Sequence, residues 1–374
     1  MRNAGEALCM STIGRNGKAA PERPDLPAER TAVEREPWNE GIDTVCETRF
    51  APRAGARDGF FLSEGDKVAV LSPSSLPSRA QAEATMKGLA GWGYVPVEGK
   101  HACVDIRTLD DCVGDLRRAL EDPEIRAVFC MRGGYGASAV MDRMPEGLIR
   151  KAGKMIVGYS DITVYHSAWA AEGVPSVHAP MSRAFINLPE ANAEAERRLL
   201  RGEIPSYTCT GVPCGRTGEA EGILAGGNLM TFTATLNTAY DCTAKGVPYL
   251  LFLEDVEENM NHLHLYLTLL KHAGVLERAA GLVFGEWIGV KQPDGSGCSG
   301  TSRGGLFRSV ADMIRREFTD ELGVPVAFGF PAGHGEVNLP LLMGAKARLA
   351  VEEDRYTLSW PGECGGKMKN KSGS

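Results

Sequence analysis

Three polar side chains in this chain have types that together could hydrolyse an amide bond. Ser160 follows a short apolar run and a glycine, Glu254 ends a second apolar run, and His334 stands between two glycines. A serine hydroxyl attacks a carbonyl carbon when an imidazole accepts its proton, and a carboxylate fixes the tautomer of that imidazole. The order Ser, Glu, His is one of several that build this geometry.

The strongest local signal surrounds Ser160. Residues 155–157 predict a buried strand, Gly158 ends it, and residues 160–171 predict a helix. A serine at such a turn is lifted clear of its own backbone, as in a nucleophile elbow. The amide of Asp161 would then lie at the positive end of the helix dipole, where an oxyanion is stabilised. Considered alone, Gly-x-Ser-Asp is more often a simple helix N-cap.

The local sequence offers other candidates for both the acid and the base. Asp255 competes with Glu254, because neighbouring residues at the end of a strand point in opposite directions. His166, on the helix after Ser160, and His178, near the end of the next strand, are alternative bases. Periodicity does not choose among them.

A glycine-rich segment, Arg132-Gly-Gly-Tyr-Gly136, follows another predicted strand. It is not the G-x-G-x-x-G pattern of a dinucleotide site. Glycines allow backbone amides to approach a ligand closely, so Gly133 or Gly134 could pair with the Asp161 amide as an oxyanion hole. A tight turn with Arg132 in an ion pair explains the segment equally well.

Composition excludes several classes of function. The formal charge of −7 and the absence of a Lys/Arg block argue against a nucleic-acid partner. The apolar runs are too short to span a bilayer, and the first 30 residues lack the apolar run of a signal peptide. The ten cysteines form no C-x-x-C pair, which predicts reduced thiols and a cytoplasmic protein. His262 and His264 diverge on a predicted helix, so no metal site is expected there.

The positioning elements follow an α/β pattern. Predicted strands and helices alternate through the first half of the chain, and this alternation predicts a parallel sheet with ligand sites at the carboxyl ends of its strands. The strands are expected at residues 66–72, 94–97, 125–131 and 155–157, and the helices at 79–91, 109–120 and 137–144. The second half adds strands at 247–252, 281–284 and 324–328, helices at 261–272 and 306–317, and a hairpin of 348–351 with 356–360.

Composition shifts divide the chain into five segments. Residues 1–62 have no sustained period and predict a disordered or loosely attached extension. Residues 63–185 form the nucleophile domain, 218–360 the domain that supplies Glu254 and His334, and 361–374 a flexible tail. Between the two domains, residues 186–217 form a linker, with a charged helix pattern at 190–200 followed by Pro205, Pro213 and several glycines. Within the second domain, residues 290–305 are rich in Gly and Ser and predict a mobile loop without Trp or Tyr.

Seven short motifs between residues 64 and 352 resemble, in order, the LD-carboxypeptidase family of serine peptidases, which includes muramoyltetrapeptide carboxypeptidase and the microcin C immunity peptidase. They are Val68-Ala-Val-Leu-Ser-Pro-Ser74, Phe129-Cys-Met-Arg-Gly-Gly-Tyr-Gly136, Val157-Gly-Tyr-Ser-Asp-Ile-Thr163, His178-Ala-Pro-Met181, Gly226-Gly-Asn-Leu229, Leu251-Phe-Leu-Glu-Asp255 and Gly333-His-Gly335.

The resemblance implies a Rossmann-like parallel-sheet domain, a C-terminal mixed α/β domain and an active site in the cleft between them. It assigns the nucleophile to Ser160, the triad acid to Glu254 and the triad base to His334. The oxyanion amides would come from Asp161 and the Gly133-Gly134 pair. It also implies that the protein uses no metal or other cofactor and is a cytoplasmic homodimer.

Two stretches depart from the family pattern. The family's arginine after Leu-Glu-Asp is absent from residues 259–265, and residues 105–114 lack the usual Gly-Thr-Asp followed by Arg. Both changes bear on substrate contacts or packing rather than on the triad.

Three hypotheses of function follow. The first is a serine carboxypeptidase that releases the terminal D-alanine of a murein tetrapeptide in cell-wall recycling. The second is a microcin-C-type immunity peptidase that cleaves aminoacyl-nucleotide amides; the lack of aromatic residues in 290–305 counts against it. The third is a ligand-binding protein on the same fold without turnover. Only small-molecule or peptide partners are expected, with no nucleic acid and no membrane.

Overall fold

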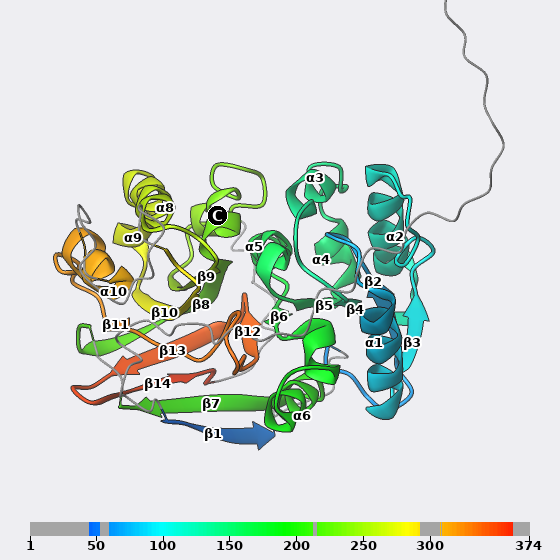
Figure 1. The fold of residues 1–374 in the computed structure, drawn as a ribbon, viewed down its shortest axis with the longest axis horizontal. Helices are drawn as coiled ribbons and strands as arrows, with labels where there is room; N and C mark the ends of the chain where they lie inside the picture. The colour runs from blue at the N-terminus through cyan, green and yellow to red at the C-terminus, as the bar shows by residue number, and fades with distance from the viewer. Residues whose placement is uncertain (1–44, 53–59, 212–214, 292–306, 308, 362–374) are drawn as a thin grey trace, which may run out of the picture. The chain divides into compact units, whose positions relative to one another are not determined.

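The computed structural model describes residues 45–52, 60–211, 215–291, 307 and 309–361. These residues form two β-sheets with helices packed on them (Figure 1). The strand order is β12-β6-β5-β4-β2-β3 in one sheet and β1-β7-β14-β13-β8-β9-β10-β11 in the other. This architecture confirms the predicted α/β class, with a parallel sheet in the first half of the chain and a mixed sheet in the second.

The six-stranded sheet is parallel apart from β12, which pairs antiparallel with β6. Its central strands are apolar and buried because they have neighbours on both sides and helices on their faces. Its strands are β2 (Lys67–Leu71), β3 (Val95–Glu98), β4 (Ile125–Cys130), β5 (Met155–Gly158), β6 (Ser176–His178) and β12 (Leu341–Met343). The connecting helices are α1 (Arg79–Gly91), α2 (Leu109–Glu121), α3 (Ala137–Met141), α4 (Leu148–Ala152) and α5 (Thr163–Ala171).

The eight-stranded sheet is mixed: β8, β9, β10 and β11 run parallel, and the other pairs are antiparallel. Its strands are β1 (Val45–Pro52), β7 (Glu203–Thr210), β8 (Gly218–Asn228), β9 (Tyr249–Val256), β10 (Gly281–Ile288), β11 (Val326–Ala327), β13 (Lys346–Val351) and β14 (Arg355–Ser359). The helices of this half are α6 (Glu190–Leu200), α7 (Leu229–Thr233), α8 (Met260–His272), α9 (Val275–Arg278) and α10 (Val310–Ile314).

Strand β1 corrects part of the predicted extension. Residues 45–52 were expected to be loosely attached, but each of them pairs with a residue of β7, from Val45 with Thr210 to Pro52 with Glu203. The rest of that extension up to residue 59, and the predicted tail from residue 362, lie outside the described residues, as does most of the predicted loop 290–305.

The predicted linker 186–217 is also more ordered than expected. It contains the helix α6, at the predicted residues, and the strand β7, which lies between β1 and β14 in the sheet. Pro205, Pro213 and the glycines of this segment predicted a linker between the domains. In the structure Pro205 sits within β7, opposite Phe50 of β1.

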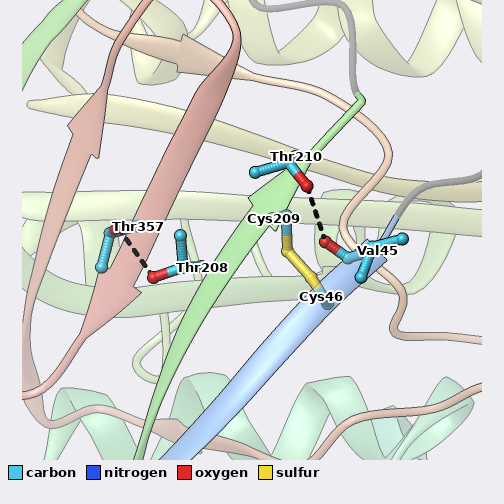
Figure 2. Close-up of a disulfide and its surroundings, with 6 residues drawn as sticks. All are labelled: Val45, Cys46, Thr208, Cys209, Thr210 and Thr357. Atoms are coloured by element: carbon cyan, nitrogen blue, oxygen red, sulfur yellow. Dashed lines mark hydrogen bonds between the residues drawn. A yellow bond between two sulfur atoms is a disulfide. The ribbon is translucent and has the colours of Figure 1, made fainter.

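A disulfide joins β1 to β7 and contradicts the prediction of uniformly reduced thiols. Cys46 and Cys209 are direct partners in the antiparallel register, and their sulfur atoms are bonded across the two strands (Figure 2). Four other described cysteines are free: Cys103, Cys112, Cys130 and Cys242. Cys9, Cys214, Cys298 and Cys364 lie outside the described residues.

None of the helices within the described ranges combines the length and the apolar character needed to cross a bilayer.

Candidate active site

Ser160 stands at a sharp turn between β5 and α5. It begins a short 3-10 helix, Ser160–Ile162, and its φ of 65° lies in the left-handed region. This conformation is unusual for a residue with a side chain and costs of order 1–3 kcal/mol, so the surrounding structure must hold it. The backbone at Ser160 therefore has the strained strand-to-helix turn that the sequence predicted.

The buried carboxylate of Asp161 supports this turn. Asp161 Oδ2 accepts hydrogen bonds from Ser74 Oγ at 2.5 Å and from the amide of Ala137 at 2.9 Å. One bond reaches the loop after β2 and the other the start of α3. The carboxylate thus connects the elbow to both neighbouring loops, which leaves the Asp161 amide as the group that could face a substrate.

The glycine-rich segment lies directly against Ser160. A Cβ added to Gly133 would stand 2.8 Å from Ser160 Cβ and 3.1 Å from Ser160 Oγ, so only glycine fits there. Ser75 fixes the segment, donating its amide to Gly133 O at 3.1 Å and accepting the Tyr135 amide on its hydroxyl at 3.1 Å. Among the described residues, no hydrogen bond uses the amides of Gly133 or Gly134.

Glu254 and His334 form a buried pair. Glu254, at the end of β9, has no exposed surface, and its Oε2 lies 2.8 Å from Nδ1 of His334. Gly333 and Gly285 make room for the carboxylate: an added Cβ would lie 2.5 Å from Glu254 Oε2 at Gly333 and 3.0 Å from Glu254 Cβ at Gly285. The hydrogen bond holds Nδ1–H toward Glu254 and leaves Nε2 as the ring's proton acceptor.

The charge of Glu254 governs the titration of His334. Burial lowers the pKa of His334, but the charge of Glu254 and the hydrogen bond to it outweigh burial and raise the pKa above its ordinary value of 6.5. The pair therefore stabilises the imidazolium that a general base becomes after it accepts a proton.

The loop that carries His334 reaches the elbow. The imidazole of His334 packs on the ring of Tyr159, the residue before Ser160, with the ring centroids 4.9 Å apart. Arg183 adds hydrogen bonds to the Tyr159 hydroxyl and to the carbonyl of His334. Residues from both halves of the chain thus meet around Ser160.

A second contact joins the two halves just behind the elbow. Thr163, at the start of α5, accepts the amide of Asn228 on its Oγ1 at 3.0 Å. At Gly227 an added Cβ would lie 2.4 Å from the same oxygen, so this close approach of α5 and β8 requires glycine. The contact fixes β8, which pairs with the strand that presents Glu254, against α5.

Asp255 points away from His334. Its carboxylate accepts hydrogen bonds from Asn228 Nδ2 at 2.7 Å and from the amides of Met230 and Val256 at 3.1 and 2.9 Å. Burial, and then the charge of Glu254, raise its pKa to about 7. The structure therefore favours Glu254 over Asp255 as the partner of the base.

His166 is hydrogen-bonded elsewhere, and neither ring nitrogen of the buried His178 has a hydrogen-bond partner among the described residues. Both nitrogens of the buried His166 have partners, Ser176 Oγ at 2.8 Å and Gly158 O at 2.9 Å, and burial lowers its pKa to about 4. His178 has no exposed surface, and burial lowers its pKa well below 6.5. Of the three candidate bases, only His334 lies against a carboxylate.

The two histidines on α8, His262 and His264, contact neighbouring side chains of the fold. His262 Nδ1 lies 2.9 Å from Glu258 Oε2, and His264 packs between the rings of Phe307 and Phe318. The described part of the chain contains no group of three or more His, Cys, Asp or Glu residues arranged to hold a metal ion.

The sequence patterns did not indicate the roles of Ser74, Arg107 and Arg183. Arg107 lies in the stretch that departs from the family pattern, and its guanidinium donates to the carbonyls of Ser72 and Ser74. Ser74 belongs to a quoted motif, but its partner is 87 residues away in sequence. Long-range contacts of this kind have no local signature.

Comparison with known proteins connects this arrangement to one family. The model of the LD-carboxypeptidase N-terminal domain matches residues 68–179, and that of the C-terminal domain matches residues 221–349. A putative carboxypeptidase of Streptomyces coelicolor is 33% identical over 317 residues, which cover 81% of this chain and 96% of the relative. A probable murein peptide carboxypeptidase of Bacillus subtilis is 29% identical over 307 residues, covering 78% and 91%.

Solved structures share the fold. Muramoyltetrapeptide carboxypeptidase from Oxalobacter formigenes is similar with a TM-score of 0.67 at 22% identity, over 78% of this chain and 97% of that one. The protein MccF, in a complex with glutamyl sulfamoyl guanosine, is similar with a TM-score of 0.67 at 18% identity, over 80% and 97%.

Proposed function

Because the chain belongs to the LD-carboxypeptidase family, we propose that it is a serine carboxypeptidase that hydrolyses an L,D-peptide bond. The observation that carries this proposal is the buried Glu254–His334 pair, 2.8 Å from oxygen to nitrogen, on a loop packed against the elbow residue Tyr159. Family membership makes the chain a peptidase; serine catalysis by these residues is the proposed step.

In the proposed reaction, Ser160 Oγ attacks the scissile carbonyl carbon while His334 Nε2 accepts its proton. The negative charge on the carbonyl oxygen is stabilised by the amides of Asp161 and of Gly133 or Gly134. His334 then gives the proton to the leaving amine, and the C–N bond breaks. A water molecule, deprotonated by His334, hydrolyses the acyl-enzyme and regenerates Ser160.

The proposed substrate is a murein tetrapeptide that loses its terminal D-alanine during peptidoglycan recycling. The name of the Bacillus subtilis relative, which matches most of this chain, supports this substrate class. The proposed steps use no metal or other cofactor.

A parallel assay tests the substrate. The protein is incubated with a murein tetrapeptide and, separately, with an aminoacyl sulfamoyl adenosine, and the released amine is quantified by mass spectrometry. The proposal predicts release of D-alanine from the tetrapeptide. Selective cleavage of the nucleotide amide would instead support the immunity-peptidase alternative, and no reaction with either compound would favour the ligand-binding alternative.

The homodimer and the cytoplasmic location stay predictions. A dimer predicts twice the mass of one chain by light scattering. The Cys46–Cys209 disulfide weighs against a cytoplasmic location, because cytoplasmic reductants keep most thiols reduced.

A further inference from the structure

Arg183 joins the two sides of the proposed active site. It lies in the short 3-10 helix Met181–Phe185, which follows β6 in the first half of the chain. Its Nη1 donates to the Tyr159 hydroxyl at 3.1 Å and to the carbonyl of His334 at 3.3 Å, and its Nη2 donates to the carbonyl of Gly335 at 3.1 Å. One guanidinium therefore binds both the residue before the nucleophile and the backbone that carries the base.

We propose that Arg183 is a positioning residue that holds the imidazole of His334 in register with Ser160. The inference rests on the proposed function, because it assigns His334 and Ser160 their catalytic roles. Arg183 itself is not required to touch the substrate.

The backbone around His334 needs such support. Gly333 and Gly335 flank the histidine, and glycine gives a chain more conformational freedom than any other residue. The Gly333 side of the loop is held by a hydrogen bond from its amide to Asn338 Oδ1 at 3.0 Å. On the other side, Arg183 binds two successive carbonyls, those of His334 and Gly335. Glu254 fixes the ring, and Arg183 fixes the backbone beneath it.

Tyr159 extends the same support to the ring of the base. Its aromatic ring packs on His334 at 4.9 Å between centroids, while its hydroxyl accepts from Arg183. A shift of the guanidinium would therefore release both the backbone of His334 and the surface against which its imidazole packs. Misplacement of a catalytic group by about 1 Å can reduce a rate by about 100-fold.

The charge of Arg183 gives the position a measurable signature. The charged and titratable groups near His334 or its loop are Glu254, Arg183, the phenol of Tyr159, His178 of β6, Glu286 of β10 and, with its side chain turned away, Asp255 of β9. Within this set Glu254 and Asp255 favour the imidazolium of His334, and the charge of Arg183 opposes it. Removal of the guanidinium charge should therefore raise the pKa of His334.

Two variants separate charge from geometry. Arg183→Gln removes the charge and the paired donors, whereas Arg183→Lys keeps the charge but has a single nitrogen that cannot reproduce the planar fork. Arg278→Gln is the matched control, because Arg278 also donates to a backbone carbonyl, that of Ala273 at 3.0 Å, outside the proposed site. The readout is the rate at which a fluorophosphonate probe labels Ser160, measured from pH 5 to pH 9.

The proposal predicts a limiting labelling rate about 10- to 100-fold lower in Arg183→Gln, with the acid limb moved to higher pH. Arg183→Lys should lose rate without that movement of the acid limb, and Arg278→Gln should match the unmodified protein. Thermal melting of each variant shows whether it is folded, and Arg183→Lys keeps the test open if Arg183→Gln does not fold.

The possible failures are distinguishable. If the probe labels Ser160 of the unmodified protein, and both Arg183 variants show the same labelling rate and pH profile, the inference is wrong and the proposed function stands. A loss of rate with an unchanged acid limb and a lower melting temperature in Arg183→Gln would assign Arg183 a purely structural role and overturn the inference. If the unmodified protein neither labels at Ser160 nor hydrolyses peptide, the proposed function fails, and the role of Arg183 fails with it.

Discussion

The adjacent carboxylates Glu254 and Asp255 have different partners because successive residues of a strand face opposite sides. Glu254 Oε2 lies 2.8 Å from the imidazole of His334, whereas Asp255 is bound by Asn228 and two backbone amides. The local sequence could not choose between them. The contact that decides joins residues 80 positions apart, and here only the family resemblance pointed to it.

Replacement of Glu254 by Gln should lower kcat by about 10³- to 10⁴-fold with a small change in KM, because a neutral amide does not stabilise the imidazolium of His334. The measurement is D-alanine release under saturating peptide. Asp255→Asn is the matched control and should keep kcat within a few-fold, since its side chain faces away. Equal losses in the two variants would contradict the assignment of Glu254.

The pH dependence follows from the raised pKa of His334. A base must be neutral to accept a proton, so kcat/KM should rise with pH through a midpoint above 6.5, and Glu254→Gln should move that midpoint to lower pH. The contribution of the Glu254–His334 pair to folding stability has the opposite pH dependence: it falls as the pH rises. The contribution of the pair is fully present below the unfolded-state pKa of about 6.5 and is lost as the pH rises through the higher folded-state pKa. An acid limb at or below 6.5 in the unmodified protein would refute this electrostatic account.

A substitution at Gly333 tests how closely the Glu254 carboxylate is enclosed. Gly333→Ala should place a Cβ 2.5 Å from Glu254 Oε2, in a backbone conformation with φ of +124°, and should abolish most activity. Gly246→Ala is the matched control, because Gly246 also has a positive φ, +72°, but no atom within 4 Å of its added Cβ. Both variants should lose about 1 kcal/mol or more of unfolding free energy from the backbone strain. Only Gly333→Ala should lose turnover; comparable activity in the two would show that the carboxylate tolerates displacement.

At the scale of elements, local signals predicted helices better than strands whose partners are distant in sequence. The helices α1 and α6 occupy the predicted residues, and α1 begins with a capping box at Ser78, a signature that is local in sequence. Strands β1, β7, β8 and β12 were not predicted. Both β1 and β7 include proline, which counts against a strand, and β1 shows no alternation of polar and apolar residues. Their pairing joins segments about 160 residues apart, so it has no local signature.

The disulfide between β1 and β7 predicts a redox-dependent stability. Reduction by dithiothreitol should lower the unfolding free energy by about 2–4 kcal/mol. The bond links residues 163 positions apart, and so it reduces the conformational entropy of the unfolded chain. The measurement is thermal or urea unfolding with and without the reductant. Cys46→Ser is the control: it should unfold like the reduced protein and should not respond to dithiothreitol. An unmodified protein that is equally stable in both conditions would show that the bond does not form in solution.

For the whole molecule, the two sheets contribute different parts of one proposed site. The six-stranded sheet presents Ser160 and the glycine-rich segment, and the eight-stranded sheet presents Glu254 on β9. Strand β12 links the two, since it follows the His334 loop in sequence but pairs with β6 of the other sheet (Figure 1). The alternation of strands and helices predicted the class of this fold. It could not predict β12, because a strand of three residues is defined by its partner rather than by its own pattern.

The most direct test of the account is the rate of D-alanine release from a murein tetrapeptide by the unmodified protein and by Ser160→Ala. The hydroxyl is the proposed nucleophile, so the substitution removes the atom that forms the acyl-enzyme while adding no bulk at the turn. We predict release by the unmodified protein and a rate at least about 10³-fold lower for a folded Ser160→Ala variant. Hydrolysis at an unchanged rate by Ser160→Ala would contradict the proposed mechanism.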